Sequence, residues 1–448
     1  MKLANIRPVA PSSTLLTNEQ SKRREAEGKN VYKFGFGQSP FLPLKRARDR
    51  LGESAAATDY TPVQGLPALC DQVAKFHNEL CGLKSSAEDI IVASGSKSIL
   101  FTIMASFAEA DVLIPSPAWV SYEPQARMLT HPVVRVPTDF AHRWRVQPDM
   151  LEACLTSRPT PSAPAILVIN YPGNPEGLTY TNDELKELAG VLRKHQVLVI
   201  ADEIYALLNH KGEYASLAHH YPEGTIITTG LSKWAGAGGW RLGVGILPSD
   251  IDPEFKKSYL GIASETYSCA PDPVQRAAIV AYQNDAETTH YLQQQRQILS
   301  IIGNSFANTL RQSGLQVHSP EGAFYLYVDF TPIKRQANAA GLQTSEQLCV
   351  QVLQDTGVAL LHSAAFGIAP EYLSARLAYV DFGGKQTEEN AENMLADMRS
   401  GATADTVVKK YASHALEGAQ YLAEWGSRAE FRPLPQLRRA NGPLRAPV

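Results

Sequence analysis

Two charged side chains follow apolar runs in the middle of the sequence, at places where burial would make them reactive. Asp202 follows the run 197–201, and Lys233 closely follows the run 225–229. A buried carboxylate is costly unless a cation or a hydrogen-bond donor faces it. A desolvated lysine has a lowered pKa, and such an amine can form a Schiff base. Either residue alone is more often half of a structural salt bridge. The residues around them are therefore needed to distinguish a reactive site from an ion pair.

A loop of small residues opens a helical stretch earlier in the chain. The run 90–93 ends in Ser94-Gly95-Ser96-Lys97, and amphipathic sequence follows directly. The free backbone N–H groups and the helix dipole at such a position suit a phosphate, although a plain helix cap looks the same in sequence. No GxGxxG follows a strand and no GxxxxGK[ST] occurs, so a dinucleotide site and a P-loop lose their main support.

Other polar residues lie at comparable positions. Asn174 lies in the segment 170–175, directly after the run 165–169, and Tyr205 comes one turn after Asp202. In an open α/β sheet, ligands gather beyond the carboxyl ends of the strands. A sheet edge that carries a phosphate loop, an Asn, an Asp with a Tyr, and a Lys therefore predicts a cofactor site.

The elements that must position these residues follow an α/β pattern. Short β-branched runs alternate with longer amphipathic stretches, and most runs are apolar throughout, as in strands buried on both faces. The helical stretch 182–195 has Thr181 as a plausible N-cap and Glu184 three residues later. We expect strands at 90–93, 112–114, 133–136, 165–169, 197–201, 225–229 and 242–246.

A smaller α+β domain is expected from about residue 285. It should contain helices over 290–313 and 345–356 and strands over 323–329, 358–362 and 376–381. We divide the chain into an N-terminal arm with part of the small domain (1–50), a large domain (51–284), a small domain (285–405) and a C-terminal extension (406–448). Residues 432–448 are rich in Pro and Arg, which predicts a flexible tail.

Composition excludes several classes of protein. The 448 residues carry 42 Lys and Arg against 45 Asp and Glu, so a nucleic-acid partner is not expected. No apolar stretch reaches the roughly 18 residues of a membrane span, and the N-terminal sequence lacks a secretory signal, so we expect a cytoplasmic protein without a membrane partner. The five cysteines are widely spaced and suggest neither a disulfide framework nor a metal site.

Several longer motifs occur in a fixed order. They are SGSKSI (94–99), SPAWVSY (116–122), NYPGNPEG (170–177), ADEIY (201–205), LSKWAGAGGWRLG (231–243), EGAFYLYVDF (321–330) and SARLAYV (374–380). With these motifs the chain, from about Phe34 to Asp381, resembles the pyridoxal-phosphate (PLP) aminotransferases of fold type I. Within them it is similar to the class I and II family around the bacterial aspartate aminotransferases. The resemblance implies a large domain with a mostly parallel seven-stranded sheet, a smaller α+β domain and PLP as cofactor.

The resemblance also implies cofactor contacts, residue by residue. Lys233 would form the Schiff base with the cofactor, and Asp202 would face the pyridine nitrogen and keep it protonated. Tyr205 and Asn174 would donate to the phenolic oxygen, and Trp119 would stack on the ring. The implied phosphate ligands are Ser232, Arg241 and the backbone amides of Gly95, Ser96 and Lys97.

Substrate contacts are implied in the same way. Arg376 would bind the α-carboxylate bidentately, with Gly37 and Asn174 close by. Tyr60 would reach the phosphate of a neighbouring subunit, which implies a homodimer with shared active sites. Lys97 resembles a lysine that meets the distal carboxylate of dicarboxylic substrates, so aspartate or glutamate is the expected amino donor and a 2-oxo acid the acceptor.

Alternatives remain on the same scaffold. An aromatic or prephenate-type aminotransferase shares all the cofactor residues, and so does a PLP lyase or decarboxylase. Arg376, as the ligand of the α-carboxylate, argues against α-decarboxylation and favours transamination. A non-catalytic PLP-binding protein would be expected to lack Lys233, and a nicotinamide oxidoreductase would need the missing glycine fingerprint. The chain departs from many relatives at Gly230, where a serine often contacts the phosphate, so that contact could be absent or come from Thr229.

Overall fold

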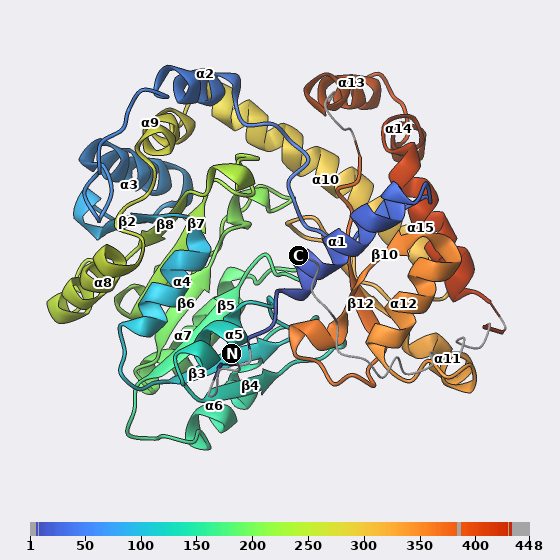
Figure 1. Cartoon of the computed structure of the whole chain (residues 1–448), viewed down its shortest axis with the longest axis horizontal. Coiled ribbons are helices and arrows are strands. Elements are labelled where there is room, and N and C mark those ends of the chain that lie inside the picture. The colour runs from blue at the N-terminus through green and yellow to red at the C-terminus, as the bar shows by residue number, and fades with distance from the viewer. Residues whose placement is uncertain (1–5, 8, 383–386, 429, 432–448) are drawn as a thin grey trace, which may run out of the picture.

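A seven-stranded sheet forms the centre of the larger part of the molecule, seen here in a computed structural model (Figure 1). The structure describes residues 6–7, 9–382, 387–428 and 430–431. The strand order is β2-β8-β7-β6-β5-β3-β4; β8 runs antiparallel to β2 and β7, and the other neighbouring strands are parallel. The strands are β2 (Ile90–Ala93), β3 (Asp111–Ser116), β4 (Val133–Pro137), β5 (Ala165–Asn170), β6 (Leu198–Asp202), β7 (Thr225–Gly230) and β8 (Gly243–Ile246).

Helices cover both faces of this sheet, which confirms the predicted α/β class. Ile166 and Val168 of β5 pack with α4, α5 and α8 on one face, whereas Leu167 and Ile169 pack with α6 and α7 on the other. Burial on both faces explains why these strands are apolar throughout. The covering helices are α4 (Ser96–Ala105), α5 (Tyr122–Met128), α6 (Pro148–Thr156), α7 (Asn182–Lys194) and α8 (Pro253–Thr266).

Two smaller sheets lie in the second part of the molecule, which α10 connects to the first (Figure 1). One is antiparallel with the order β11-β12-β9, and the other pairs β1 with β10 in parallel. This last pair brings the N-terminal segment into the second part. The elements are α1 (Ser13–Ala26), β1 (Tyr32–Lys33), α2 (Lys45–Glu53), α3 (Pro67–Cys81), α9 (Asp272–Ala281), α10 (Ala286–Gln312), β9 (Tyr325–Asp329), α11 (Lys334–Ala339), α12 (Ser345–Thr356), β10 (Val358–Ala359), β11 (Leu361–His362) and β12 (Ser374–Ala378).

Short 3-10 helices connect several of these elements. They are η1 (Ala87–Asp89), η2 (Ala206–Leu208), η3 (Leu217–His219), η4 (Pro222–Gly224), η5 (Gly238–Trp240), η6 (Thr331–Ile333) and η7 (Ser363–Phe366). Within the described part of the chain, no helix is both long and apolar enough to cross a membrane.

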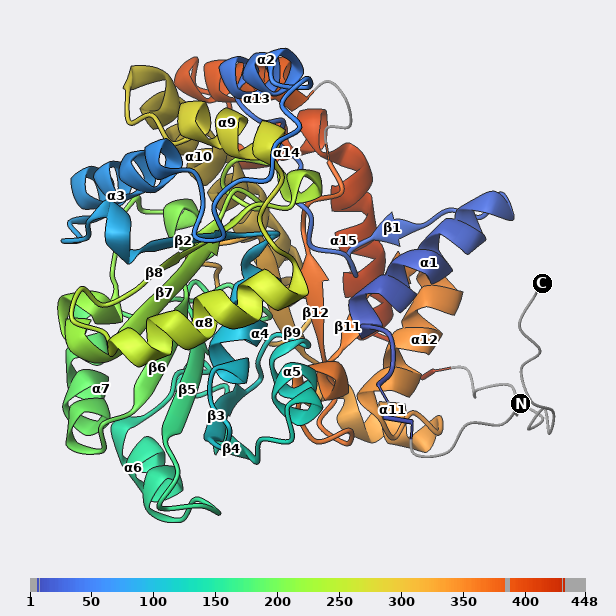
Figure 2. The ribbon, with the colours of Figure 1, turned by 60° about the vertical axis from the view of Figure 1, so that its left-hand side comes forward.

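Three helices close the C-terminal part and pack against α10, as Figure 2 shows from a second direction. They are α13 (Thr387–Arg399), α14 (Ala404–Tyr411) and α15 (Ser413–Gly426). Trp425 of α15 is fully buried, and its indole donates to Asp355 Oδ2 at 2.9 Å. Tyr32 of β1 donates to Glu417 Oε2 at 2.8 Å, so α15 also holds the N-terminal strand. The predicted extension 406–448 therefore begins as packed helix, and the predicted tail 432–448 lies outside the described residues.

Most predicted elements are confirmed within one or two residues at each end. The capping box at Thr181 forms, with the Thr181 hydroxyl accepting from the Glu184 N–H at 3.2 Å. The predicted strand 376–381 is wrong in position, because β12 starts at Ser374 and Tyr379 leaves the ladder to donate to the Phe324 carbonyl. The predicted strand 358–362 splits into β10 and β11, which belong to different sheets. The domain boundaries remain predictions.

Candidate active site

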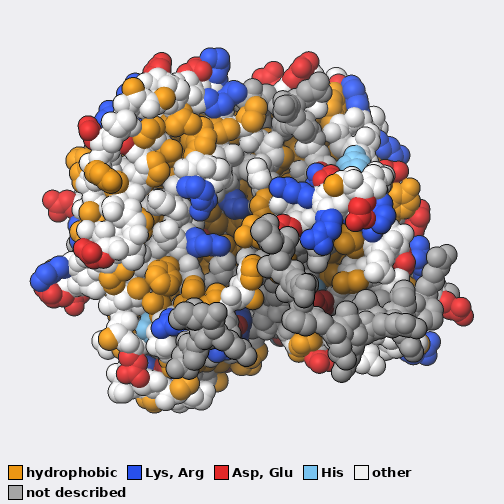
Figure 3. Space-filling view, in the orientation of Figure 1, with side chains coloured by type: hydrophobic (Ala, Val, Ile, Leu, Met, Phe, Trp, Pro, Cys, Tyr) orange, Lys and Arg blue, Asp and Glu red, His pale blue; other side chains and the backbone are white. Residues whose placement is uncertain are grey.

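A cavity of about 310 Å³ opens where β5, β6 and β7 end. Figure 3 shows a hollow between the two parts of the molecule, with Lys and Arg side chains around it. Of the predicted site residues, Gly95 and Tyr60 do not line the cavity. Those that line it are Gly37, Ser96, Lys97, Trp119, Asn174, Asp202, Tyr205, Ser232, Lys233, Arg241 and Arg376. The structure thus brings together side chains from widely separated motifs.

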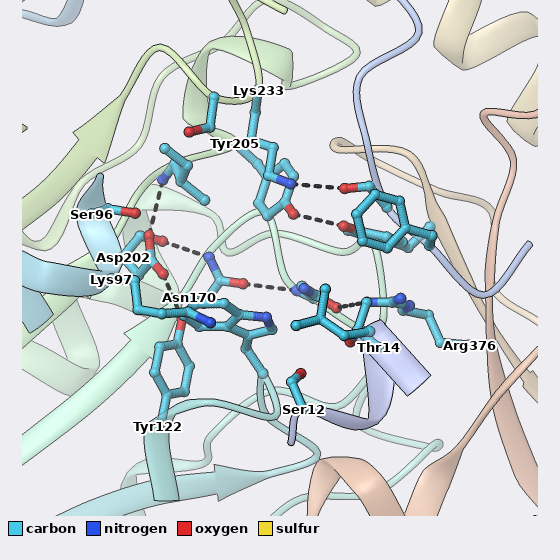
Figure 4. A pocket seen from close by; sticks show the side chains of 18 of the residues that line it. Ser12, Thr14, Ser96, Lys97, Tyr122, Asn170, Asp202, Tyr205, Lys233 and Arg376 are labelled. Atoms are coloured by element: carbon cyan, nitrogen blue, oxygen red, sulfur yellow. Dashed lines mark hydrogen bonds between the residues drawn. The ribbon is translucent and has the colours of Figure 1, made fainter. Parts of the chain in front are cut away.

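Lys233 projects into the cavity from the loop after β7 (Figure 4). Its Nζ donates to the carbonyl of Gly37 at 2.8 Å and lies 5.4 Å from the centroid of the Tyr205 ring. Burial, reinforced by the charge of Arg376, lowers the pKa of Lys233 to about 8. With this pKa roughly a tenth of these amines is neutral at pH 7, and a neutral amine is the form that acts as a nucleophile or base.

Asp202 is the last residue of β6, whereas the sequence predicted that the strand would end one residue before it. The strand includes Asp202 because the backbone of Asp202 still pairs with Asn170 of β5. Its Oδ2 accepts from the Tyr122 hydroxyl at 2.6 Å, and its Oδ1 accepts from the Ile204 N–H at 3.3 Å. Burial raises the pKa of Asp202 to about 6, against the lowering effect of the Tyr122 hydrogen bond. A cationic ligand beside this carboxylate would favour its ionised form.

One end of the cavity suits an anion. Ser96, at the first position of α4, shares this end with Ser232 and Arg241. Gly95 precedes the helix with a φ of +92°, and a Cβ there would lie 2.2 Å from Arg241 Nη2. Gly95 therefore lets the guanidinium approach the start of the helix, where N–H groups and the dipole already favour negative charge.

The backbone explains the glycine at position 230. Gly230 has a φ of +153°, and a Cβ would lie 2.6 Å from the carbonyl oxygen of Leu242, the residue just before the adjacent β8. A serine would therefore clash with β8 in this conformation. Thr229 does not line the cavity, so it does not replace the missing hydroxyl.

Lys97 and Trp119 meet at the cavity wall. The Lys97 Nζ lies 5.0 Å from the centroid of the Trp119 ring, and this ring packs edge-on against Tyr122 at 5.3 Å. Burial, together with the charge of Arg241, lowers the pKa of Lys97. Lys97 is thus a solvent-exposed residue of α4 whose ammonium lies at the cavity wall beside Trp119.

Tyr205 and Tyr325 form a hydroxyl pair opposite Lys233. Their oxygens are 2.7 Å apart, and their rings are nearly perpendicular at 81°. Gly37 lies against this pair, because a Cβ there would come within 2.0 Å of the Tyr325 hydroxyl. The close-approach glycine predicted at position 37 therefore leaves room for Tyr325 and offers its own carbonyl to Lys233.

Arg376 is a fully buried cation in the middle of β12. Its Nη1 donates to Asn174 Oδ1 at 2.8 Å and its Nη2 to the carbonyl of Gly35 at 2.7 Å, while Nε lacks a partner among the described residues. The rings of Tyr325 and Phe366 lie 4.7 and 5.3 Å from its guanidinium carbon. No carboxylate of the described residues pairs with it, and a buried cation without a counter-charge is expected to bind an anion.

Tyr60 lies outside the cavity and is 90% exposed. Within one chain it contacts none of the predicted cofactor ligands, so its predicted role requires a second subunit. Exposure of a large aromatic side chain to this degree is compatible with such a role.

The predictions missed several cavity residues. Tyr122, Asn170 and Tyr325 stand inside motifs quoted above, yet no role was assigned to them, although a buried Asp202 had to have a donor. Ser12 and Thr14 come from the N-terminal segment and also line the cavity (Figure 4). Their sequence context is an ordinary polar stretch, which carries no signal for a site.

Comparison with known proteins agrees with this geometry. A family model described as aminotransferase class I and II matches residues 28–381. The aspartate aminotransferase of Geobacillus stearothermophilus is 33% identical over 390 residues, covering 85% of this chain and 94% of the relative. The aspartate/prephenate aminotransferase of Cereibacter sphaeroides is 29% identical over 388 residues, covering 83% of this chain and 92% of that protein.

Solved structures show the same fold. The aspartate aminotransferase of Rhizobium meliloti superposes with a TM-score of 0.79 at 23% identity, covering 96% of this chain and 99% of that one. An aspartate aminotransferase of Thermus thermophilus gives a TM-score of 0.77 over 94% of this chain and 100% of that one, at 23% identity. The chain belongs to the class I and II aminotransferases and has their fold type I architecture.

Proposed function

We propose that this aminotransferase binds PLP in the cavity and uses it to move amino groups between dicarboxylic amino acids and 2-oxo acids. One observation carries the proposal: a lysine with a lowered pKa lies in the same cavity as a buried carboxylate and a buried guanidinium without a counter-charge. Family members use PLP, and the residues present fit it. The start of α4 with Ser232 and Arg241 would hold the phosphate, and Asp202 would face the ring nitrogen.

Trp119 would stack on the cofactor ring, and Tyr205 with Asn174 would donate to its phenolic oxygen. Asn174 Oδ1 already accepts from Arg376, which leaves the Nδ2 hydrogens of the same amide available. If Tyr325 donates to Tyr205, the proton of Tyr205 is likewise free for the ring. Asn174 and Tyr205 can therefore both donate to the phenolic oxygen, which supports the proposed orientation of the cofactor ring.

When bound, PLP supplies an electron sink for the charge that remains after the Cα–H bond breaks. Arg376 binds the α-carboxylate through two parallel hydrogen bonds and so fixes the direction of the Cα–H bond. The Lys233 amine takes the proton from Cα, and the low pKa keeps part of it in the basic form at neutral pH.

Lys97 supports a dicarboxylic substrate, because an ammonium at the cavity wall can bind a distal carboxylate. Both relatives named above carry aspartate in their names. A prephenate-type or aromatic aminotransferase remains the second candidate, and the name of the Cereibacter relative supports it. An α-decarboxylase is disfavoured, since Arg376 would hold the α-carboxylate that α-decarboxylation removes.

The exposure of Tyr60 supports a homodimer in which each subunit supplies this tyrosine to the other's phosphate site. The cytoplasmic location stays a prediction.

The experiment uses the purified holoenzyme with 2-oxoglutarate and, in turn, aspartate, glutamate, phenylalanine and alanine, following formation of the new 2-oxo acid. We expect kcat/KM to be highest for a dicarboxylic donor. Comparable values for alanine and aspartate would refute the dicarboxylic preference, and no transfer with any donor would refute the proposed activity.

A further inference from the structure

The short strand β1 leads directly into the active site. The carbonyl of Gly35, two residues after β1, accepts from Arg376 Nη2 at 2.7 Å. The carbonyl of Gly37 accepts from Lys233 Nζ at 2.8 Å, and Gly37 also lines the cavity. The path of the backbone after β1 therefore sets the positions of the acceptors that two cations of the cavity use.

By itself β1 is too short to hold this path. It consists of Tyr32 and Lys33, which pair with the two residues of β10. Isolated pairs of strands are marginally stable at best, so other elements must keep β1 in place. One anchor comes from β12, because the Phe34 carbonyl accepts from the Ala378 N–H at 2.8 Å. The Phe34 ring also packs on Phe306 of α10, with centroids 6.0 Å apart.

A second anchor is α15, which lies beside β1 (Figure 2). Tyr32 is 1% exposed, and its hydroxyl donates to Glu417 Oε2 at 2.8 Å. The centroids of the His414 and Tyr421 rings lie 4.7 and 5.8 Å from that of Tyr32. Gly418 permits this approach, because a Cβ there would lie 2.6 Å from Tyr32 Cγ. The four α15 residues follow the i, i+3, i+4, i+7 spacing of one helix face, so this face fits the tyrosine.

The guanidinium of Arg376 depends on the Gly35 carbonyl for its orientation. Asn174 Oδ1 accepts from Nη1 and Gly35 from Nη2, so the two acceptors fix the plane of the group. Bidentate binding of a carboxylate requires that plane, because it uses two parallel hydrogen bonds. A displaced Gly35 would therefore weaken the binding of the α-carboxylate without removing any residue that contacts it.

The family model matches residues 28–381, which include β1 and β12 but not α15. We propose that α15, through the face that packs on Tyr32, positions the Gly35 carbonyl and with it the guanidinium of Arg376. Residues of that face are positioning residues, because they line no part of the cavity and act through Tyr32. The inference rests on the function proposed above for Arg376.

Binding of 2-oxoglutarate to the holoenzyme measures the carboxylate contact without turnover, because this acid has an α-carboxylate but no amino group to transfer. We expect Gly418→Ala to raise the Kd from titration calorimetry about threefold or more, since the added methyl group must displace α15 from Tyr32. A Kd equal to that of the wild type would overturn the proposal. If Gly418→Ala does not fold, Tyr32→Phe decides in the same way, because it removes the hydroxyl and keeps the ring.

Glu417 allows a rescue test, because its side chain is exposed and its substitution spares the core. Glu417→Ala should raise the Kd in the same direction as Gly418→Ala. Glu417→Gln keeps an acceptor for the Tyr32 hydroxyl and should bind 2-oxoglutarate like the wild type. A Kd raised equally in both Glu417 variants would contradict a role for this hydrogen bond.

Trp425→Phe is the matched control on the same helix. Trp425 lies two turns after Gly418, and its indole donates at 2.9 Å to Asp355 of α12 and not to β1. We expect this variant to lower the melting temperature of the holoenzyme and to leave the Kd for 2-oxoglutarate unchanged. A Kd raised as much as in Gly418→Ala would mean that any loosening of α15 has this effect, which would refute the specific contact with Tyr32.

Two further measurements keep this inference apart from the proposed function. PLP affinity from equilibrium dialysis should be unchanged in Gly418→Ala, and a loss equal to the rise in Kd would overturn the inference. Arg376→Lys should bind 2-oxoglutarate more weakly than the wild type. Equal binding by Arg376→Lys would refute the proposed role of Arg376, and the inference with it. Weak binding by Arg376→Lys beside normal binding by Gly418→Ala would refute the positioning role alone.

Discussion

Arg376 combines full burial with a charge that no described carboxylate neutralises. We expect Arg376→Lys to lower kcat/KM for aspartate about tenfold to a hundredfold, because a charge-assisted hydrogen bond contributes about 1.5 to 3 kcal/mol. The loss should appear mainly in KM for the amino acid, with PLP affinity nearly unchanged. Steady-state kinetics and equilibrium dialysis with PLP measure the two quantities. A loss of PLP affinity equal to the loss in kcat/KM would show that the guanidinium serves the cofactor.

Lys233 is the residue whose removal should stop the reaction while sparing the fold. Lys233→Ala deletes an amine that makes one hydrogen bond, to the Gly37 carbonyl. The variant should retain PLP non-covalently through the anion end of the cavity and show no measurable transamination. Turnover near the wild-type rate would mean that another group moves the proton.

Lys97 decides the substrate preference if it binds a distal carboxylate. We expect Lys97→Met to lower the ratio of kcat/KM for aspartate to that for phenylalanine about tenfold or more, from the same charged hydrogen bond. Arg127, on the neighbouring α5 and outside the cavity, gives a matched control in Arg127→Met. If the two variants give the same aspartate-to-phenylalanine ratio, Lys97 does not determine the substrate preference.

At the scale of elements, α15 is part of the hydrophobic core and contributes to the stability of the fold. Trp425→Ala removes a fully buried indole and its hydrogen bond to Asp355, and we expect a loss of about 3 to 5 kcal/mol in the free energy of unfolding. A chain that ends after Phe431 should keep the wild-type stability, since the composition of 432–448 predicts no core. Thermal or urea unfolding of both proteins checks this contrast. Equal stability of the two would overturn it.

The elements also show how far the sequence leads. Apolar β-branched runs predict β2 and β5 closely, because both of their faces are buried and the pattern is unambiguous. The start of β12 at Ser374 was missed, since small polar residues in a buried strand carry no pattern and only the ladder with β9 places them. The contribution of Ser12 and Thr14 to the cavity was missed for a related reason, because tertiary packing alone brings the N-terminal segment there.

At the scale of the whole molecule, the role proposed for Tyr60 requires a homodimer. A dimer with shared sites should lose PLP affinity about tenfold or more in Tyr60→Phe, through one lost hydrogen bond to a charged phosphate. Analytical ultracentrifugation of the wild type should show a dimer at micromolar concentration. An active monomer at that concentration, with unchanged PLP affinity in the variant, would rule out the shared site.

The contacts of Arg376 determine when, during synthesis of the chain, the carboxylate pocket can form. Its guanidinium touches Gly35 and Asn174, which lie 341 and 202 positions away along the chain. Contacts of such sequence separation form late, because long loops must close first. A nascent chain on the ribosome can complete the large sheet well before β12 has been synthesised. The carboxylate pocket is therefore absent from every translation intermediate that ends before β12, and catalytic competence arrives only with the nearly finished chain.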